Sequence, residues 1–275
     1  GVLQRASAYL DRTDGTSSAS TSAPESSWVH GELREITSPQ GLTSLIKSRR
    51  RWSELHALVS LYADAFNGIH VNAACTQLVQ LMPHTQRRTP LQQRLTSDRT
   101  QANGNGIGQP ERSAEASPEL QALCATLLEL VSRHQHSFAP RQIANCAWAL
   151  SKWPVHSDAL GGVLQGLLQR AEACLPEFRP QEVSSLLYAA GRAGVALPPA
   201  WLGKLQLAWA QQMQRFRPQE LANLLWALGL QPRAAEAAPE LIAGLVRAQL
   251  AAEGGLGAAQ PRELLQSLQG LANLG

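Results

Sequence analysis

The sequence predicts an all-α protein, an α-solenoid of stacked helix-turn-helix repeats of about 38–43 residues. Apolar residues make up 44% of the 275 residues, and most of them are Ala and Leu, which favour helices. One phrase of fifteen residues also recurs along the chain, with its apolar positions at helical spacing. A single helix pair cannot bury its apolar face alone, so each repeat is expected to pack against the next.

The repeated phrase occurs as FAPRQIANCAWALSK (138–152), FRPQEVSSLLYAAGR (178–192), FRPQELANLLWALGL (216–230) and, in a diverged form, AAQPRELLQSLQGLANLG (258–275). Its prolines are spaced 40, 38 and 43 residues apart, at Pro140, Pro180, Pro218 and Pro261. Proline suits the first position of a helix, because the N–H that it lacks would be unpaired there. Each phrase therefore predicts a helix, called here the A helix, and Gly191 and Gly229 are expected to end two of them.

The residues three, seven and ten positions after each proline are apolar in all four copies, which gives every A helix one apolar face. A second helix, the B helix, is expected over 157–174, 198–216 and 238–252, and Pro118 is expected to open another. A phenylalanine stands two residues before the first three repeat prolines. We expect these rings to fix the turn between the B and A helices, at Phe138, Phe178 and Phe216.

Domain boundaries follow from changes in composition. Residues 1–36 are expected to be a disordered leader, and 83–117, rich in Gln, Arg, Thr, Gly and Ser, a flexible low-complexity insertion. Residues 37–82 predict an N-terminal lead-in of three helices, with Ser38 as an N-cap and a turn at Asn67–Gly68 before the third. The repeats occupy 118–275. The last repeat is truncated after its first helix, so we expect the natural chain to continue beyond Gly275.

The phrase F-x-P-Q-E-L-A-N-x-L-W-A-L, the period, and the PPAW of 198–201 together resemble the octotricopeptide repeat family. These are helical-repeat RNA-binding proteins, abundant in green-algal organelles and related to FASTK and RAP-domain proteins. AFNGIHVNAACTQLVQL (65–81) also looks like the lead-in of that family. The resemblance covers 37–82 and 118–275. It departs in two ways: PPPEW is reduced to PPAW in one unit, and the RAP domain is absent from this chain.

The resemblance implies that the partner is single-stranded organellar RNA, either mRNA or rRNA. It implies a role in RNA processing, stability, splicing or translation, with other ribonucleoprotein subunits as further candidate partners, and it favours the chloroplast slightly over the mitochondrial matrix. Two other classes stay open from the residues alone: a protein-binding scaffold and a structural subunit of an organellar ribosome. The net charge of +3 is too small to decide between them.

Three recurrent positions of the A helices are candidate RNA contacts. Five residues after the proline, a small polar side chain could read base edges on a concave face, or could form a buried hydrogen-bonded ladder, at Asn145, Ser185, Asn223 and Gln266. The residues one and twelve positions after the proline share that face. They could hold phosphates or form a solvated surface, at Arg141, Gln181, Gln219, Arg262, Lys152 and Arg192.

Two further sets of residues lie near these positions. The aromatic residues eight positions after the proline, Trp148, Tyr188 and Trp226, are expected to fill the gap between helices, with base stacking as the alternative. A basic cluster lies in the lead-in. It could contact the RNA backbone or could simply end a helix, at Lys47, Arg49, Arg50 and Arg51.

No pattern in the sequence supports catalysis. His134 and His136 lack further metal ligands nearby, and NGNGIGQ (103–109) lacks the strand and the Lys-Ser/Thr of a phosphate loop. We therefore expect no enzyme activity, metal, cofactor or small-molecule substrate. The four cysteines, none of them in a C-x-x-C pair, are expected to be buried free thiols in a reducing compartment. No apolar run is long enough to span a membrane.

Overall fold

A computed structural model describes residues 39–82, 117–154, 158–251 and 260–274, and every regular element in these ranges is helical. The α-helices are α3 (Pro39–Ser48), α4 (Trp52–Tyr62), α5 (Gly68–Leu81), α7 (Pro118–His134), α8 (Pro140–Leu150), α9 (Asp158–Glu172), α10 (Pro180–Ala193), α11 (Pro199–Trp209), α12 (Pro218–Gly229), α13 (Ala234–Ala237), α14 (Pro239–Ala251) and α15 (Pro261–Leu274). Short 3-10 turns precede α5, α8, α10 and α12.

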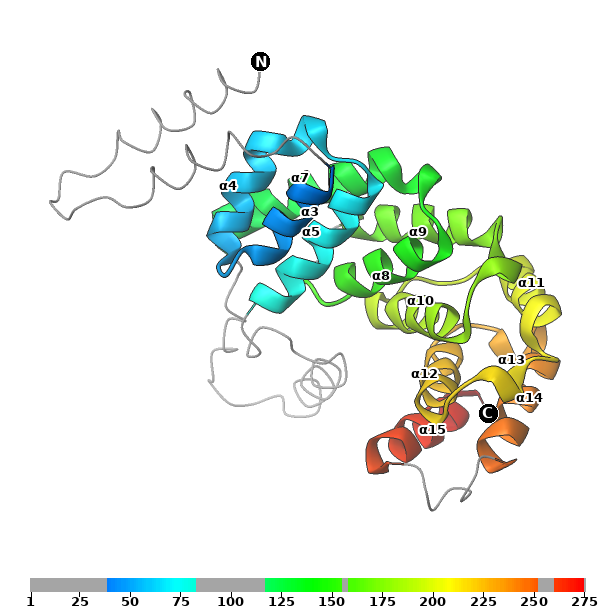
Figure 1. The fold of residues 1–275 in the computed structure, drawn as a ribbon. Helices are drawn as coiled ribbons and strands as arrows, with labels where there is room; N and C mark the ends of the chain where they lie inside the picture. The colour runs from blue at the N-terminus through cyan, green and yellow to red at the C-terminus, as the bar shows by residue number, and fades with distance from the viewer. Residues whose placement is uncertain (1–38, 83–116, 155–157, 252–259, 275) are drawn as a thin grey trace, which may run out of the picture.

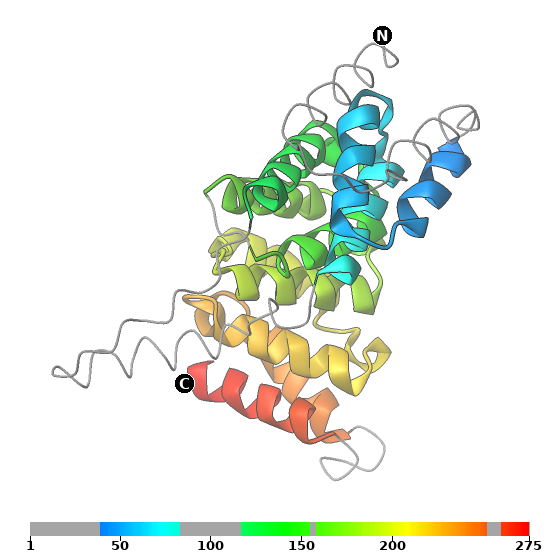
Figure 2. The same ribbon diagram turned by 90° about the vertical axis from the view of Figure 1, so that its left-hand side faces the viewer.

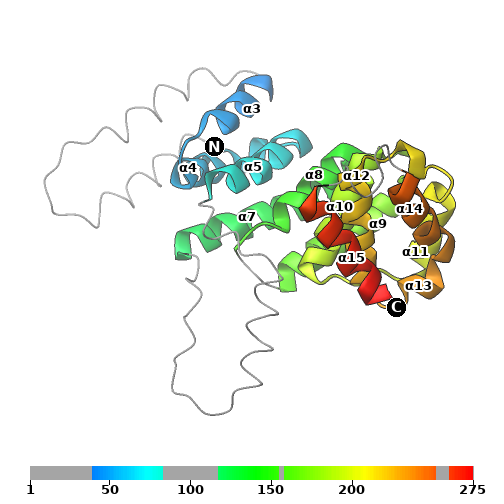
Figure 3. The same ribbon diagram turned by 90° about the horizontal axis from the view of Figure 1, so that it is seen from below.

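The helices form two layers that run along the molecule (Figure 1). In the A row each helix packs against the next in the order α3, α5, α8, α10, α12 and α15. The B row covers one side of it with α4, α7, α9, α11 and α14. Figure 3 shows α10, α12 and α15 of the A row on one side and α11 and α14 of the B row on the other. The predicted α-solenoid of stacked helix pairs is therefore confirmed.

The predicted helix starts are confirmed, and a second residue type supports them. Prolines open α7, α8, α10, α11, α12, α14 and α15. Two residues after the repeat proline, a Glu or Gln side chain turns back and accepts the N–H of the residue before the proline. The N···O distance of this bond is 2.9 Å in α8 (Gln142), 2.8 Å in α10 (Glu182) and 2.9 Å in α12 (Glu220). This bond satisfies one of the donors that a helix start leaves unpaired.

The glycine prediction is wrong for α10. Its helix continues through Gly191 to Ala193 and ends at Gly194, whose φ of 69° is the left-handed conformation that glycine favours. Gly191 instead lets α12 approach, because a Cβ there would lie 3.3 Å from the Cα of Ala227. Gly229 is the last residue of α12, as expected. A Cβ on Gly229 would lie 2.8 Å from the Cα of Gly270, so α12 and α15 are in close backbone contact (Figure 2).

The turns before the A helices contain the residues that the sequence predicts there. Phe138, Phe178 and Phe216 are all buried at the turn that leads into an A helix. The predicted B helix over 198–216 is too long, because α11 ends at Trp209 and Met213–Arg215 forms a 3-10 turn. Before α5, Asn67 accepts the backbone N–H groups of Ile69 and His70 at 3.0 and 3.1 Å, as an N-cap does.

Several predictions fall outside the described residues. They are the leader over 1–36, the Ser38 cap, and the insertion over 83–117 apart from Ser117. Ser117 is the N-cap of α7, and its side chain accepts the N–H of Leu120 at 3.3 Å.

The apolar face of α15 is left uncovered by the described residues. Leu268 is 64% exposed, whereas Leu225, which holds the same repeat position in α12, is 0% exposed. Leu265 and Leu271 beside it are exposed as well. In each preceding repeat these positions are buried, because the next A helix packs on them.

All four cysteines are buried free thiols, as predicted. A hydrogen bond with Cys146, together with burial, raises the pKa of Cys75 well above its usual value. Burial also raises the pKa of Cys124, from 9.0 to about 12, and that of Cys174. Because the thiolate is the nucleophile, these thiols are held in their unreactive form.

We expect an alkylating reagent to modify none of the four cysteines in the native protein at mildly alkaline pH, and all four after denaturation. Counting alkylated cysteines by mass spectrometry checks this. Folding raises the pKa of Cys124 above the value of 9.0 that the thiol has in the unfolded chain. The contribution of this thiol to the free energy of unfolding is therefore complete below pH 9.0 and is lost as pH rises toward about 12. Rapid labelling of the native protein would show that the helices around these thiols open readily.

Candidate nucleic-acid interface

The A helices expose one stripe of side chains on the side away from the B row, called here the A face. It consists of the positions one, five, eight and twelve residues after the helix start, which recur at a spacing of four, three and four residues and so lie on one side of a helix. Nearly all of them in α8, α10 and α12 are exposed or half-buried. The remaining sides of these helices pack against the B row or against neighbouring A helices.

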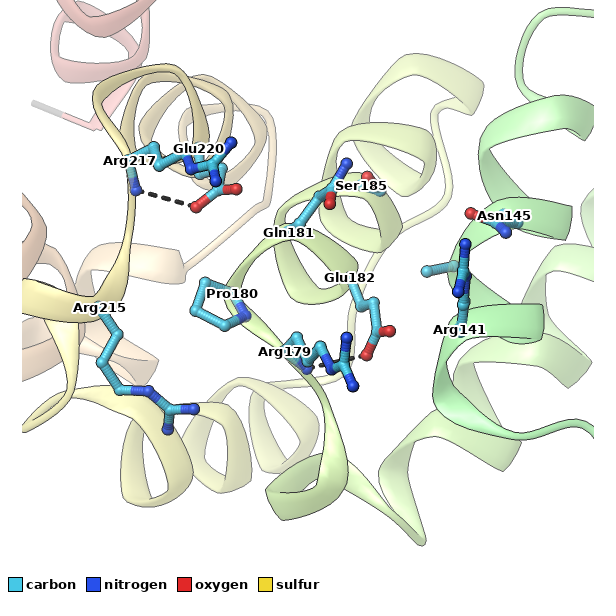
Figure 4. Close-up of a pocket in the computed structure, with 11 residues that line it drawn as sticks. Arg141, Asn145, Arg179, Pro180, Gln181, Glu182, Ser185, Arg215, Arg217 and Glu220 are labelled. Carbon is cyan, nitrogen blue, oxygen red and sulfur yellow. Dashed lines mark hydrogen bonds between the residues drawn. The ribbon is translucent and has the colours of Figure 1, made fainter.

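A recess of about 380 Å³ opens on the A face between the N-terminal ends of α8, α10 and α12 (Figure 4). Side chains of these three A helices and of the turns before α10 and α12 surround it. Its lining is Arg141, Ala144, Asn145, Arg179, Pro180, Gln181, Glu182, Ser185, Arg215, Arg217 and Glu220.

The charge of the recess is predominantly positive, with four arginines against two glutamates. Glu182 and Glu220 already accept the backbone N–H groups of Arg179 and Arg217 at the helix starts (Figure 4). Within the described ranges, none of the ion pairs involves Arg141, Arg179 or Arg217. Exposed guanidinium groups without a carboxylate partner favour an anionic ligand, and they match phosphate oxygens with paired N–H donors.

Four of the predicted contact residues lie together in this recess: Arg141, Asn145, Gln181 and Ser185. Gln219, Asn223, Arg262 and Gln266 do not line it, although they occupy the same repeat positions on α12 and α15. Asn223 instead places its Nδ2 3.5 Å from the Oγ of Ser184 on α10. Asn223 therefore matches the second interpretation of its repeat position, a side chain that forms a hydrogen bond with a neighbouring helix.

Three recess arginines were not predicted as contacts: Arg179, Arg215 and Arg217. Arg179 and Arg217 directly precede the repeat prolines, so the recurring FRPQE carries the signal. Their side chains enter the recess because the chain there is extended, just before each helix begins. Arg215 packs over the Trp209 ring, 5.3 Å from its centroid, and also bonds to Gln212.

Lys152 and Arg192 lie at the other end of the A face. Arg192 donates its Nε to the carbonyl oxygen of Ser151 at 2.7 Å and so connects α10 to the end of α8. Burial has the largest effect on the pKa of Lys152 and lowers it; the positive charges of Arg192 and Arg262 lower it further, whereas the interaction and hydrogen bond with Tyr188 oppose this shift. A lysine placed in this way costs folding free energy while it is charged.

We expect Lys152→Met to raise the thermal unfolding midpoint at neutral pH, since the substitution removes a partly buried charge and keeps the length of the side chain. The folded pKa lies below the usual lysine value of 10.5, so the wild type gains stability as pH rises toward that value. The advantage of the variant should therefore shrink in alkaline buffer. Melting curves across pH test this, with Arg247→Met, at an exposed cation of α14, as the control. A lower midpoint for Lys152→Met would mean that its ring contacts outweigh the burial.

The aromatic residues divide into two groups. Tyr188 packs on Trp226 with ring centroids 5.0 Å apart, and Trp226 is 8% exposed, so these rings fill the gap between α10 and α12 as predicted. The prediction is wrong for Trp148, which is 37% exposed. Lys152 Nζ lies 5.8 Å from the Trp148 ring centroid and 4.9 Å from that of Tyr188.

The basic cluster of the lead-in lies at the turn between α3 and α4, outside the recess. Arg49 is 8% exposed, and its guanidinium donates to the Leu45 carbonyl oxygen at 3.1 Å and to Ser48 Oγ at 3.0 Å. Arg51 pairs with Glu54 at 2.9 Å. The side chains of Lys47 and Arg50 are exposed. The turn thus offers fewer available cations than its sequence indicates.

The fold and the A face define the class of this protein as an α-solenoid of helix-pair repeats. No protein-family model matches the chain, and no curated protein matches it significantly. In the part of the chain that the structure covers, no helix has the length and apolarity to cross a membrane. Over the same residues, no group of three or more His, Cys, Asp or Glu is arranged to hold a metal ion.

Proposed function

We propose that this protein is a non-catalytic helical-repeat protein that binds single-stranded RNA on its A face and acts in organellar RNA metabolism. Its target would be an mRNA or rRNA. Occupying such a segment would affect its processing, stability, splicing or translation. The resemblance to octotricopeptide repeat proteins supports the organellar setting, with the chloroplast ahead of the mitochondrion.

The observation that carries the proposal is the recess between α8, α10 and α12. Its exposed arginines offer donors for phosphate oxygens, which provide affinity without reading sequence. Asn145 and Ser185 are the polar side chains of successive repeats on the same face. Each could form hydrogen bonds with the edge of an unpaired base, so that phosphate contacts and base contacts alternate along the row.

The test begins with the purified chain and labelled oligoribonucleotides. We expect single-stranded RNA to bind with an affinity that falls steeply as salt rises, and more tightly than a duplex of the same sequence. Crosslinking of the tagged protein in its native cells, followed by sequencing, should then enrich one organellar transcript or rRNA segment. If oligonucleotides do not bind even at low salt and no RNA crosslinks above background, the proposal is wrong.

A second candidate is a protein-binding scaffold or a structural subunit of an organellar ribosome. The small net charge of +3 over 275 residues favours this alternative, because it gives only a weak overall attraction for a polyanion. Crosslinking separates the readings: rRNA enriched together with ribosomal proteins supports the subunit. Partner proteins recovered without RNA support the scaffold.

A further inference from the structure

One row of side chains crosses the A face near the C-terminal half of its helices. It contains the residue eight positions after the start of five consecutive A helices: Thr76 in α5, Trp148 in α8, Tyr188 in α10, Trp226 in α12 and Gln269 in α15. These helices are consecutive neighbours in the A row (Figure 2). Three aromatic rings therefore occupy the middle of the row, with Thr76 beyond one end.

The three rings differ in how well the protein covers them. Trp226 is buried, and Tyr188 lies on it at an interplanar angle of 35°. Lys152 lies between the next two rings of the row, with its Nζ near both Tyr188 and Trp148. Beyond Trp148 the row continues with Thr76, a small side chain whose hydroxyl donates to the Asn72 carbonyl oxygen of its own helix at 2.9 Å. At 37% exposed, the Trp148 indole is the more accessible end of this stack of rings, whereas Trp226 at the other end is buried.

The charge beside this indole is positive. Arg192 and Arg262 act on Lys152 as positive charges, the Tyr188 hydroxyl is its hydrogen-bond partner, and no Asp or Glu carboxylate of the described ranges is among the groups that act on it. Large aromatic side chains ordinarily bury most of their surface, and cations ordinarily have a counter-ion or open water. An exposed indole next to a half-buried lysine therefore offers a surface for a flat ring and a site for an anion side by side.

We propose that Trp148 and Lys152 form a subsite for one unpaired nucleotide, whose base stacks on the indole and whose phosphate contacts the ammonium group. The inference rests on the proposed function and locates part of it. Trp148 follows Arg141 by seven residues along α8, a rise of roughly 10 Å, so a single strand a few nucleotides long can reach both the recess and this subsite. Stacking accepts every base, so the subsite adds affinity and selects unpaired strands.

Three variants test the subsite by fluorescence anisotropy. The probes are a mixed-sequence single-stranded oligoribonucleotide and an oligonucleotide with the same backbone in which every base is removed. Trp148→Leu should weaken binding of the first probe roughly 5- to 100-fold and leave binding of the abasic probe and the salt dependence unchanged. Trp148→Phe, which keeps a ring, should retain most of the affinity. Lys152→Gln should weaken both probes and reduce the salt slope by about 0.7, the contribution of one phosphate contact on a single strand.

The outcomes separate this inference from the proposed function. If the wild type binds RNA and Trp148→Leu binds it equally well, the stacking subsite is wrong and RNA binding stands. If Trp148→Leu weakens both probes to the same degree, the indole does not act on bases and the subsite is again wrong. If the wild type binds neither probe, both proposals fail. Melting curves in which no variant unfolds at a lower temperature than the wild type guard against a loss of folding.

Discussion

Leu225→Asp is expected to unfold the array around α12, whereas Leu268→Asp leaves the protein folded. The two leucines hold the same position in their repeats, seven residues after the proline. Leu225 is fully buried, so an aspartate there would lose its hydration without gaining a partner, at a cost of about 3 kcal/mol or more. Leu268 faces solvent, and its carboxylate would stay hydrated.

Urea unfolding followed by circular dichroism measures this difference. Leu225→Asp should lower the midpoint strongly, or lose part of its helical signal already in water, while Leu268→Asp should follow the wild-type curve closely. Leu225→Ala is a less disruptive substitution at the same position. It is expected to lower the free energy of unfolding by about 2–5 kcal/mol, because packing around the side chain is lost. Equal effects of the two Asp variants would mean that α15 is covered in solution as α12 is.

Replacing Arg141, Arg179 and Arg217 together with Gln is expected to weaken single-stranded RNA binding roughly 100-fold at about 0.1 M salt. Each phosphate contact on a single strand contributes a salt slope of about 0.7, so losing three should reduce the slope by about two. These side chains line the recess from α8 and from the turns before α10 and α12, and they lack ion-pair partners among the described residues. Their removal should therefore leave stability almost unchanged.

A matched control removes three positive charges from the B helices, with Arg133→Gln, Lys204→Gln and Arg247→Gln. All three side chains are exposed, and the change in net charge is the same. We expect this variant to lose little affinity and to keep most of the salt slope. If the two triple variants weaken binding equally, overall charge attracts the RNA and the recess is not its site.

Much of the architecture could be predicted because the determinants are local. Proline at the first helical position, together with apolar residues three, seven and ten positions later, is enough to set both the start and the buried face of α8, α10 and α12. The same period places Arg141, Asn145, Gln181 and Ser185 on one face, and the structure brings these four together.

The predictions that failed concern residues whose surroundings depend on neighbouring helices or on the turns between helices. The Ala and Leu residues around Trp148 indicate a buried ring, yet the indole is 37% exposed, and the equivalent position of the neighbouring α5 holds the small Thr76. Gly191 resembles a helix end, but it is kept small by the approach of α12. The arginines before the prolines were overlooked because a helical period gives no direction for residues outside the helix.

The nearest-neighbour packing of the A row has a consequence for cooperativity. Because each A helix packs closely only with adjacent members of the row and nearby B helices, the free energy that couples distant repeats is passed along in single steps. Terminal units, with a neighbour on one side only, open first, and the array loses its order progressively from its ends. A strand laid across α8, α10 and α12 would touch several units at once. Its binding would then couple repeats that the protein itself connects only in series.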